Sequence, residues 1–203
     1  MSQMNIPPDI DEIHTALSQE VTHLHVKWKI FCQLYASGDE VVDLLNSSAS
    51  GFFHLCQEMW GDDILLTIGR LIDPKQSFKK DNLSLGQLVN SIDRVRFPTL
   101  KAEIERLLAE AKDKCDVVKD HRNKRIAHND LTTKLQPGAN LIPAPTKQNI
   151  EDALKSIRDV VNSVPKYFRN SPIAFVNYED IAWPFDGNAL ITRLREAKHI
   201  KGN

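Results

Sequence analysis

Apolar residues recur every three or four positions along most of this chain, and that spacing restricts it to a helical fold. The longest stripe of this kind lies near the N-terminus and comprises Ile10, Ile13, Leu17, Val21, Leu24, Trp28, Phe31 and Leu34. Side chains at this spacing share one face of an α-helix. Pro7-Pro8-Asp9 is typical of a helix start, and Ser37-Gly38-Asp39 is typical of a break. We therefore predict one long amphipathic helix before Gly38.

The same spacing predicts further helices along the chain. Their approximate ranges are 40–72, 84–92, 97–129, 146–165 and 188–199. Pro74 prevents the first of these from continuing, and Gly51 or Gly61 could kink it or split it in two. Residues 75–82 are polar, and residues 131–145 contain three prolines and a glycine. We expect both of these segments to be loops.

Long helices joined by short breaks predict an all-α bundle with long antiparallel helices. We expect residues 1–164 to form this bundle. Residues 165–203 then form an irregular, aromatic C-terminal arm with a short helix, packed on the same domain. The aromatic residues of this arm include Phe175, Tyr178 and Trp183.

Composition and missing motifs exclude several function classes. A formal net charge of -1 excludes a chain that is basic overall, so nucleic acid could contact only a local patch. Three scattered cysteines indicate reduced, core-filling thiols. No signal peptide or membrane span is visible, and we expect a cytoplasmic protein without a membrane partner. His23 and His25 fall on different sides of a helix, and no zinc or nucleotide motif occurs, so we expect no metal and no cofactor.

One arginine interrupts an apolar stripe. The stripe of the helix predicted over 97–129 comprises Ile104, Leu107, Leu108, Ala111, Cys115 and Val118. Four residues after Val118 comes Arg122, and four after that comes Ile126, so a guanidinium occupies a position that should be buried. A buried charge needs an anion, a partner or an interface. Alternatively, the helix rolls slightly and Arg122 reaches solvent from a buried stem.

The surroundings of Arg122 are locally basic. Residues 112–125 contain six lysines and arginines against three aspartates, with His121 and His128 nearby. Such a run is usually a solvated face, but it could also hold a phosphate.

At these residues the chain resembles a known family. Arg122-Asn123, followed by four residues and then His128, is similar to the motif of HEPN domains, a superfamily of helical proteins. The segments 70–74 (Arg-Leu-Ile-Asp-Pro) and 82–85 (Asn-Leu-Ser-Leu) resemble its abortive-infection-linked, AbiU-like branch. The similarity is concentrated in residues 40–130.

The resemblance implies a helical bundle of HEPN type that cuts RNA without a metal, as a toxin or phage-defence effector with a possible antitoxin partner. In that case the 2′-hydroxyl of the RNA attacks the neighbouring phosphodiester. The implied catalytic residues are Arg122 and His128, the implied substrate-binding residues are Asn123, Lys124, Arg125 and Lys119, and Arg70 and Asp73 are supporting residues.

The spacing of the motif favours a homodimer. Six residues of helix separate Arg122 from His128 by about 9 Å of rise and about 120° of rotation. One helix therefore cannot easily place both groups on one phosphate, whereas two copies near a twofold axis could.

Two other interpretations remain open. The basic patch could belong to a non-catalytic module that binds a nucleotide, RNA or a protein. The protein could also be purely structural, with Arg122 paired to Asp73 or Asp120. Some HEPN toxins that the chain resembles carry a modifiable tyrosine two residues after the histidine, and Asp130 stands there in this sequence.

Overall fold

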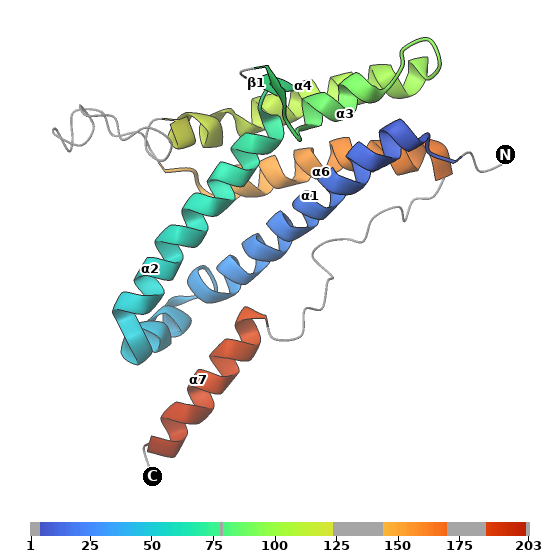
Figure 1. Cartoon of the computed structure of the whole chain (residues 1–203). Helices are drawn as coiled ribbons and strands as arrows, with labels where there is room; N and C mark the ends of the chain where they lie inside the picture. Colours follow the sequence, from blue (N-terminus) through green and yellow to red (C-terminus); the bar gives the residue numbers. More distant parts are fainter. Residues whose placement is uncertain (1–4, 78, 124–143, 170–185, 202–203) are drawn as a thin grey trace, which may run out of the picture. The chain divides into compact units, whose positions relative to one another are not determined.

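The computed structural model describes residues 5–77, 79–123, 144–169 and 186–201. Within these ranges the chain is almost entirely helical (Figure 1). The helices are α1 (Pro8–Tyr35), α2 (Asp39–Ile72), α3 (Leu85–Ser91), α4 (Pro98–His121), α6 (Lys147–Arg169) and α7 (Gly187–Lys201). A two-residue antiparallel pair, β1 (Gln76–Ser77) and β2 (Lys80–Asp81), is the only sheet in the described residues. The all-α fold class is confirmed.

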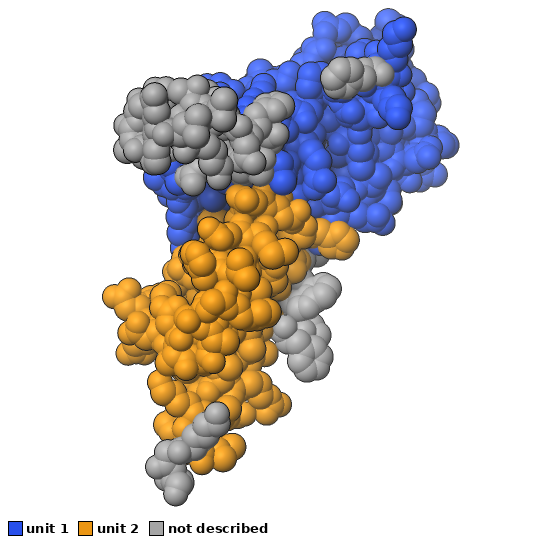
Figure 2. All heavy atoms as spheres, turned by 60° about the vertical axis from the view of Figure 1, so that its left-hand side comes forward, with its two compact units in different colours: residues 1–22, 65–175 blue, residues 23–64, 176–203 orange. Residues whose placement is uncertain are grey.

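The chain divides into two compact units, which Figure 2 distinguishes by colour. Unit 1 comprises Met1–Thr22 and Leu65–Phe175, and unit 2 comprises His23–Ile64 and Val176–Asn203. The division that we expect after residue 164 stays a prediction.

The core of unit 1 lies between α4 and α6, which pack side by side (Figure 1). The residues of α4 that are buried repeat at three- and four-residue intervals and are Leu100, Ile104, Leu108, Ala111, Cys115, Val118 and His121. Opposite them α6 buries Ile150, Ala153, Leu154, Ile157, Val160, Val161, Val164 and Phe168. The apolar stripe that predicted this helix therefore does face the core, up to the residue before the motif.

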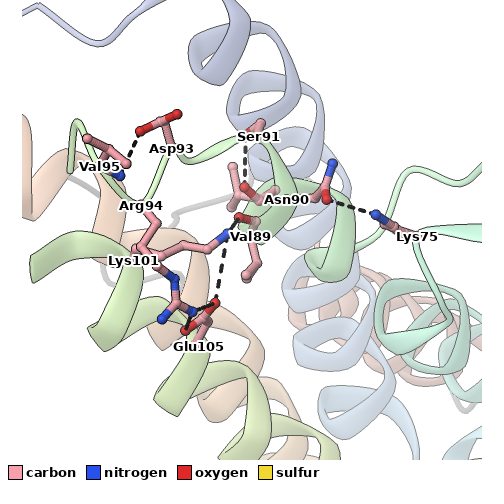
Figure 3. Close-up of polar contacts among 10 residues, drawn as sticks. Lys75, Val89, Asn90, Ser91, Asp93, Arg94, Val95, Lys101 and Glu105 are labelled. Atoms are coloured by element: carbon pink, nitrogen blue, oxygen red, sulfur yellow. Dashed lines mark hydrogen bonds and ion pairs between the residues drawn. The ribbon is translucent and has the colours of Figure 1, made fainter. Parts of the chain in front are cut away.

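Polar contacts fasten the start of α4 to α3 (Figure 3). The Lys101 ammonium on α4 donates to the carbonyl oxygen of Val89 on α3. Arg94, in the connection, donates to both carboxylate oxygens of Glu105 at 2.7 Å. Asp93 accepts the backbone N–H of Val95, which closes the turn before α4. These contacts fix the N-terminal end of the helix that carries the motif at its other end.

Unit 2 is built from the rest of α1 and α2 together with α7. One hydrophobic cluster of unit 2 consists of the buried residues Leu34, Val41, Leu44, Leu45, Phe53 and Ile191. Gln33 on α1 holds the start of α7: its side chain donates to Asp186 and accepts the backbone N–H of Gly187. Gly38 has φ +125° in the break between α1 and α2, a conformation that favours glycine. The predicted break at this position is confirmed.

Two details of the region from α2 to β2 differ from the prediction. The kink in α2 lies at Ala49 (φ -162°, ψ 72°), so its prediction at Gly51 or Gly61 is wrong. Just before this kink, the hydroxyls of Ser47 and Ser48 both donate to the carbonyl oxygen of Leu44, a kind of hydrogen bond that often bends helices. The segment 75–82, expected to be a loop, contains the small β1–β2 pair.

The end of α6 also differs from the prediction. The sequence predicts an end near Pro165, but the helix continues to Arg169, with Pro165 buried inside it. Proline has no N–H to give to the carbonyl oxygen of Val161, four residues earlier. The buried His14 of α1 supplies the missing donor, because its Nε2 lies 3.2 Å from that oxygen. A tertiary hydrogen bond thus replaces the helical one.

The start of α6 and the last helix agree with the predictions from the sequence. Thr146 precedes α6, and its hydroxyl accepts the backbone N–H of Asn149, as predicted for a cap. The last helix is confirmed as α7. The predicted end of the motif helix near Asn129, most of the loop 131–145 and the central part of the aromatic arm lie outside the described residues.

Candidate functional site

The candidate site begins where α4 ends. His121 is the last residue of α4, and Arg122 still has helical backbone angles (φ -53°, ψ -51°). The backbone N–H of Arg122 donates to the carbonyl oxygens of Val118 and Lys119. The side chain therefore leaves the backbone on the face that Val118 occupies one turn earlier, which is the buried face of α4.

Arg122 is held by a two-pronged ion pair with Asp73. Its Nη1 lies 3.1 Å from Oδ2 and its Nη2 lies 3.1 Å from Oδ1 of this aspartate. The Arg122 side chain is 13% exposed and the Asp73 side chain 28% exposed. Of the alternatives that the sequence left open, the pairing with Asp73 is the one observed. Two parallel charge-assisted hydrogen bonds fix both the position and the plane of the guanidinium.

Asn123 and Gly69 also contribute to the position of the Arg122 guanidinium. The Nε of Arg122 donates to Oδ1 of the neighbouring Asn123 at 3.1 Å. On α2, a Cβ added to Gly69 would lie only 2.5 Å from Cδ and 2.7 Å from Nη1 of Arg122. The arginine therefore lies directly on the backbone of α2, and a side chain at position 69 would require the guanidinium to shift. Sequence reasoning did not assign Gly69 a role, and the signal was a glycine inside an otherwise apolar helix end.

Arginine has five N–H donors, and the contacts with Asp73 and Asn123 use three of them. Within the part of the chain that the structure describes, two donors remain, one on each terminal nitrogen. These two donors and the partial exposure of the side chain allow a further anion, such as a phosphate, to approach. The Asp73 carboxylate offsets the charge of the guanidinium. The arrangement therefore combines a fixed hydrogen-bonding fork with a reduced net charge.

The other predicted site residues are distributed as follows. Arg70 is exposed and donates from Nη2 to the hydroxyl of Thr67 at 2.9 Å, while Asp73 is engaged by Arg122. Lys119 is half-buried on the last turn of α4. Lys124, Arg125 and His128 lie outside the described residues, so the structure brings together Arg122, Asn123 and Asp73 from the predicted set.

The described residues were also searched for reactive thiols, metal ligands and membrane-spanning helices. The three cysteines, all in described residues, form no disulfide with one another; Cys115 is buried, whereas Cys32 and Cys56 are only partly buried. Burial raises the pKa of Cys115 to about 12, so this thiol is unreactive. Among the described residues no group of three or more histidine, cysteine or acidic side chains is arranged to hold a metal ion. In the same part of the chain, none of the helices has the length and apolar character that crossing a bilayer requires.

Comparison with known proteins gives one match. No curated protein and no solved structure matches the chain. The family model HEPN_AbiU2, described as AbiU2, matches residues 7–183, a longer range than the motifs alone indicated. This range contains the ion pair of Arg122 with Asp73 and most of the helices described above. The chain therefore belongs to the AbiU2 family of HEPN proteins.

Proposed function

We propose that this protein is a metal-independent endoribonuclease of HEPN type that acts as a toxin or phage-defence effector. One observation carries the proposal. The motif arginine is fixed by Asp73 and Asn123 on the backbone of Gly69, and among the described residues two of its donors remain for an anion. Such preorganised donors stabilise developing charge without reorganising during the reaction.

In the proposed reaction, the 2′-oxygen of a ribose attacks the adjacent phosphorus and the bond from phosphorus to the 5′-oxygen breaks. A base accepts the proton of the 2′-hydroxyl, and an acid protonates the departing 5′-oxygen. The products carry a 2′,3′-cyclic phosphate and a 5′-hydroxyl. DNA is inert because it lacks the nucleophile.

Each predicted residue has a distinct task in this reaction. His128 acts as the general base or acid, since imidazole titrates near neutral pH. Arg122 stabilises the charge on the pentacoordinate phosphorus. Lys119, Lys124 and Arg125 bind flanking phosphates without reading sequence. Asp73 is a positioning residue that acts through Arg122. Arg70 lies three residues before Asp73 and is a supporting residue at the end of α2.

A second copy of the chain belongs to the proposal. A continuous helix would separate Arg122 from His128 by about 9 Å of rise, so we propose that groups from two chains act on one phosphate. The RNA, the second copy and an antitoxin are the proposed partners.

The test is cleavage of end-labelled RNA in the presence of a chelator. We expect the parent protein to produce cyclic-phosphate ends, and Arg122→Ala and His128→Ala to remove this activity. The matched control is Arg106→Ala, which removes an exposed arginine of the same helix that pairs with Glu103 and Glu110. An RNA with a single 2′-deoxy nucleotide at the cut position should resist cleavage there. Equal rates for the parent and both site variants would contradict the proposal.

One observation favours a second candidate function. Asp73 already engages both terminal nitrogens of Arg122, and this reduces the attraction of the site for a phosphate in the resting protein. A non-catalytic module that binds a nucleotide, RNA or a protein would tolerate this pairing. Retention of labelled RNA on the protein without any new ends would favour that function.

A further inference from the structure

Large apolar side chains are exposed on the part of α2 that follows the kink at Ala49, within unit 2. Phe52, Leu55 and Met59 are 63%, 58% and 68% exposed. Their spacing of three and four residues places them on one face of the helix, and we call these three residues the α2 stripe. Contiguous apolar patches on a protein surface mark interaction sites.

The α2 stripe lies on the side of α2 that is turned away from the core of unit 2. The helix packs inward through Phe53, which is buried in the hydrophobic cluster, and through Gly61, where an added Cβ would lie 3.9 Å from the ring of Phe31. Helix geometry places Phe53 and Gly61 at least about 100° around the axis from each residue of the stripe. The packing of α2 among the described residues therefore leaves the stripe exposed.

The segment of α2 that carries the stripe is acidic. Residues 39–69 contain six acidic residues and no lysine or arginine, whereas the whole chain is nearly balanced, with 26 lysines and arginines against 27 acidic residues. One of the six, Asp63, is half-buried and pairs with Lys27 of α1. The other five are exposed and are Asp39, Glu40, Asp43, Glu58 and Asp62.

Two of these carboxylates extend the stripe along its own face. Glu58 follows Leu55 by three residues, and Asp62 follows Met59 by three residues. Residues at this spacing are neighbours on a helix surface. The stripe therefore ends in two exposed acids, and a partner that covers its apolar side chains also meets their charge.

Nearby cations offset only part of this charge. His54 lies 3.8 Å from Glu58 and carries a positive charge only when it is protonated. Before the kink, the ammonium of Lys198 on α7 lies 3.4 Å from the hydroxyl of Ser47, on the segment that also exposes three acids. One ammonium can offset one carboxylate, so the surface around the stripe stays acidic.

We propose that the α2 stripe docks an amphipathic helix of another protein, whose apolar residues repeat every three or four positions and are flanked by lysine or arginine. Helix-on-helix packing removes the stripe from water, which contributes about 25 cal/mol for each Å² of apolar surface buried. The unbranched Met59 side chain can adapt to differently shaped partners. The lysines and arginines of the partner meet Glu58 and Asp62, and this charge pairing selects the partner.

The same charges disfavour three other occupants of the stripe. RNA and an anionic bilayer are repelled by the carboxylates. A second copy of the chain that placed its own stripe there would bring acidic residues against acidic residues. The observations therefore favour a basic helix from a different protein.

The docking surface does not rest on the proposed function. The α2 stripe belongs to unit 2, whereas Arg122 and Asp73 belong to unit 1. A variant with Arg122→Ala should bind the helical partner as the parent does, so the two proposals can fail independently.

The first test is the fluorescence anisotropy of a labelled synthetic peptide mixed with the full-length protein. The peptide has about 18 residues, or five helical turns, with leucines at three- and four-residue spacing and lysines beside them. We expect it to bind at least about tenfold more tightly than the same peptide with glutamate in place of each lysine. A scrambled peptide of equal composition should also bind at least about tenfold more weakly, since it lacks an apolar face. Equal affinity for the three peptides would overturn the proposal.

The second test removes one apolar side chain from the stripe. Leu55→Ser should weaken binding of the lysine peptide about tenfold. The matched control is Val95→Ser, at an apolar position of unit 1 that is 91% exposed, and it should bind as the parent does. Far-UV circular dichroism checks that both variants stay helical. An unchanged affinity for folded Leu55→Ser would contradict docking on the stripe.

The third test reverses the charge beside the stripe. The double variant Glu58→Lys/Asp62→Lys should prefer the glutamate peptide over the lysine peptide. The control Asp113→Lys/Asp116→Lys makes the same change in net charge at exposed positions of α4 in unit 1 and should keep the preference of the parent. An equal shift of preference in both double variants would show that the peptide responds to overall charge, and the proposal would fail.

The other occupants are distinguished with the same variant of Leu55. Sedimentation gives the mass of the parent and of Leu55→Ser, and flotation gives their binding to phosphatidylglycerol vesicles. We expect Leu55→Ser to change neither property. A halved mass would assign the stripe to a second copy, and lost vesicle binding would assign it to a lipid surface; either result would overturn the proposal.

Discussion

Two polar side chains interrupt apolar helix faces in unit 1, and the protein accommodates them differently. His14 of α1 is buried, 4% exposed, and its ring donates to the carbonyl oxygen of Val161 that Pro165 cannot serve. Arg122 after α4 is 13% exposed and meets the carboxylate of Asp73. The histidine repairs a gap in the backbone hydrogen bonding of α6, whereas the arginine is an added charge that needs its own partner.

The difference separates a structural polar group from a candidate functional one. His14 is buried, and it donates to the carbonyl oxygen of Val161, which has no helical donor because Pro165 lacks an N–H. Arg122 is the first residue of the HEPN motif and is partly exposed, and within the described residues two of its five donors remain beyond its three contacts. A polar group with donors to spare on an accessible edge is the better candidate for binding a ligand.

The largest effect is expected from Asp73→Ala. This change leaves the half-buried guanidinium without its anion, and we expect kcat for RNA cleavage to fall about 100-fold because Arg122 loses its fixed orientation. The free energy of unfolding should fall by about 1–3 kcal/mol. Rates from single-turnover cleavage and urea unfolding measure the two effects.

The matched control for this prediction is Asp63→Ala, which removes an exposed ion pair with Lys27. Exposed pairs contribute under about 1 kcal/mol, so stability and cleavage should change little. A variant of Asp73 that behaves like this control would show that the pair with Arg122 has no special role.

The contact of His14 is tested by a rescue. His14→Ala leaves the carbonyl oxygen of Val161 without a donor and should lower the free energy of unfolding by about 1–3 kcal/mol. Adding Pro165→Ala restores a backbone N–H for this oxygen and should recover part of the loss. Neither change should alter RNA cleavage per folded molecule. Additive losses in the double variant, measured by urea unfolding, would contradict the proposed replacement.

Gly69→Ala should affect the site more than the fold. The added methyl must displace the side chain of Arg122, and we expect RNA cleavage to fall about tenfold. Alanine also favours the helix by about 1 kcal/mol, which offsets the steric cost, so stability should stay nearly constant. Gly51→Ala, where nothing lies within 4 Å of the added Cβ, is the control and should retain full cleavage.

The smallest effect is a pH dependence of stability. Burial lowers the pKa of His14 from its usual 6.5, although the hydrogen bond to Val161 and the nearby Asp11 act in the opposite direction. The unfolded chain therefore binds a proton near pH 6.5, while the folded chain binds it only at lower pH. Stability should decline as the pH falls below 6.5, by about 1 kcal/mol near pH 5.5. The double variant His14→Ala/Pro165→Ala should lack this component in urea unfolding at pH 7.5 and 5.5.

Much of the helical fold could be predicted from the sequence, because apolar spacing, prolines and caps act locally. Gly38 and Thr146 occupy the predicted break and cap. The continuation of α6 through Pro165 could not be predicted, since the donor that permits it comes from His14, far away in the sequence. Similarly, the kink lies at Ala49, directly after two serines whose hydroxyls bond back to the carbonyl oxygen of Leu44, and not at a glycine.

The candidate site was predictable in part for the same reason. The position of Arg122 on the buried face follows from counting along one helix. Its choice of Asp73 over Asp120 depends on how α2 and α4 meet within unit 1. The role of Gly69 becomes visible only when the guanidinium is seen on its backbone.

The most direct test of the central claim is the cleavage rate of Arg122→Lys, compared with its affinity for an RNA made uncleavable by 2′-deoxy substitution. Lysine keeps the charge but not the planar fork that Asp73 orients. We predict a loss of cleavage of about 100-fold with affinity within about threefold of the parent. Cleavage at the parental rate would contradict a role for the fixed guanidinium in the reaction.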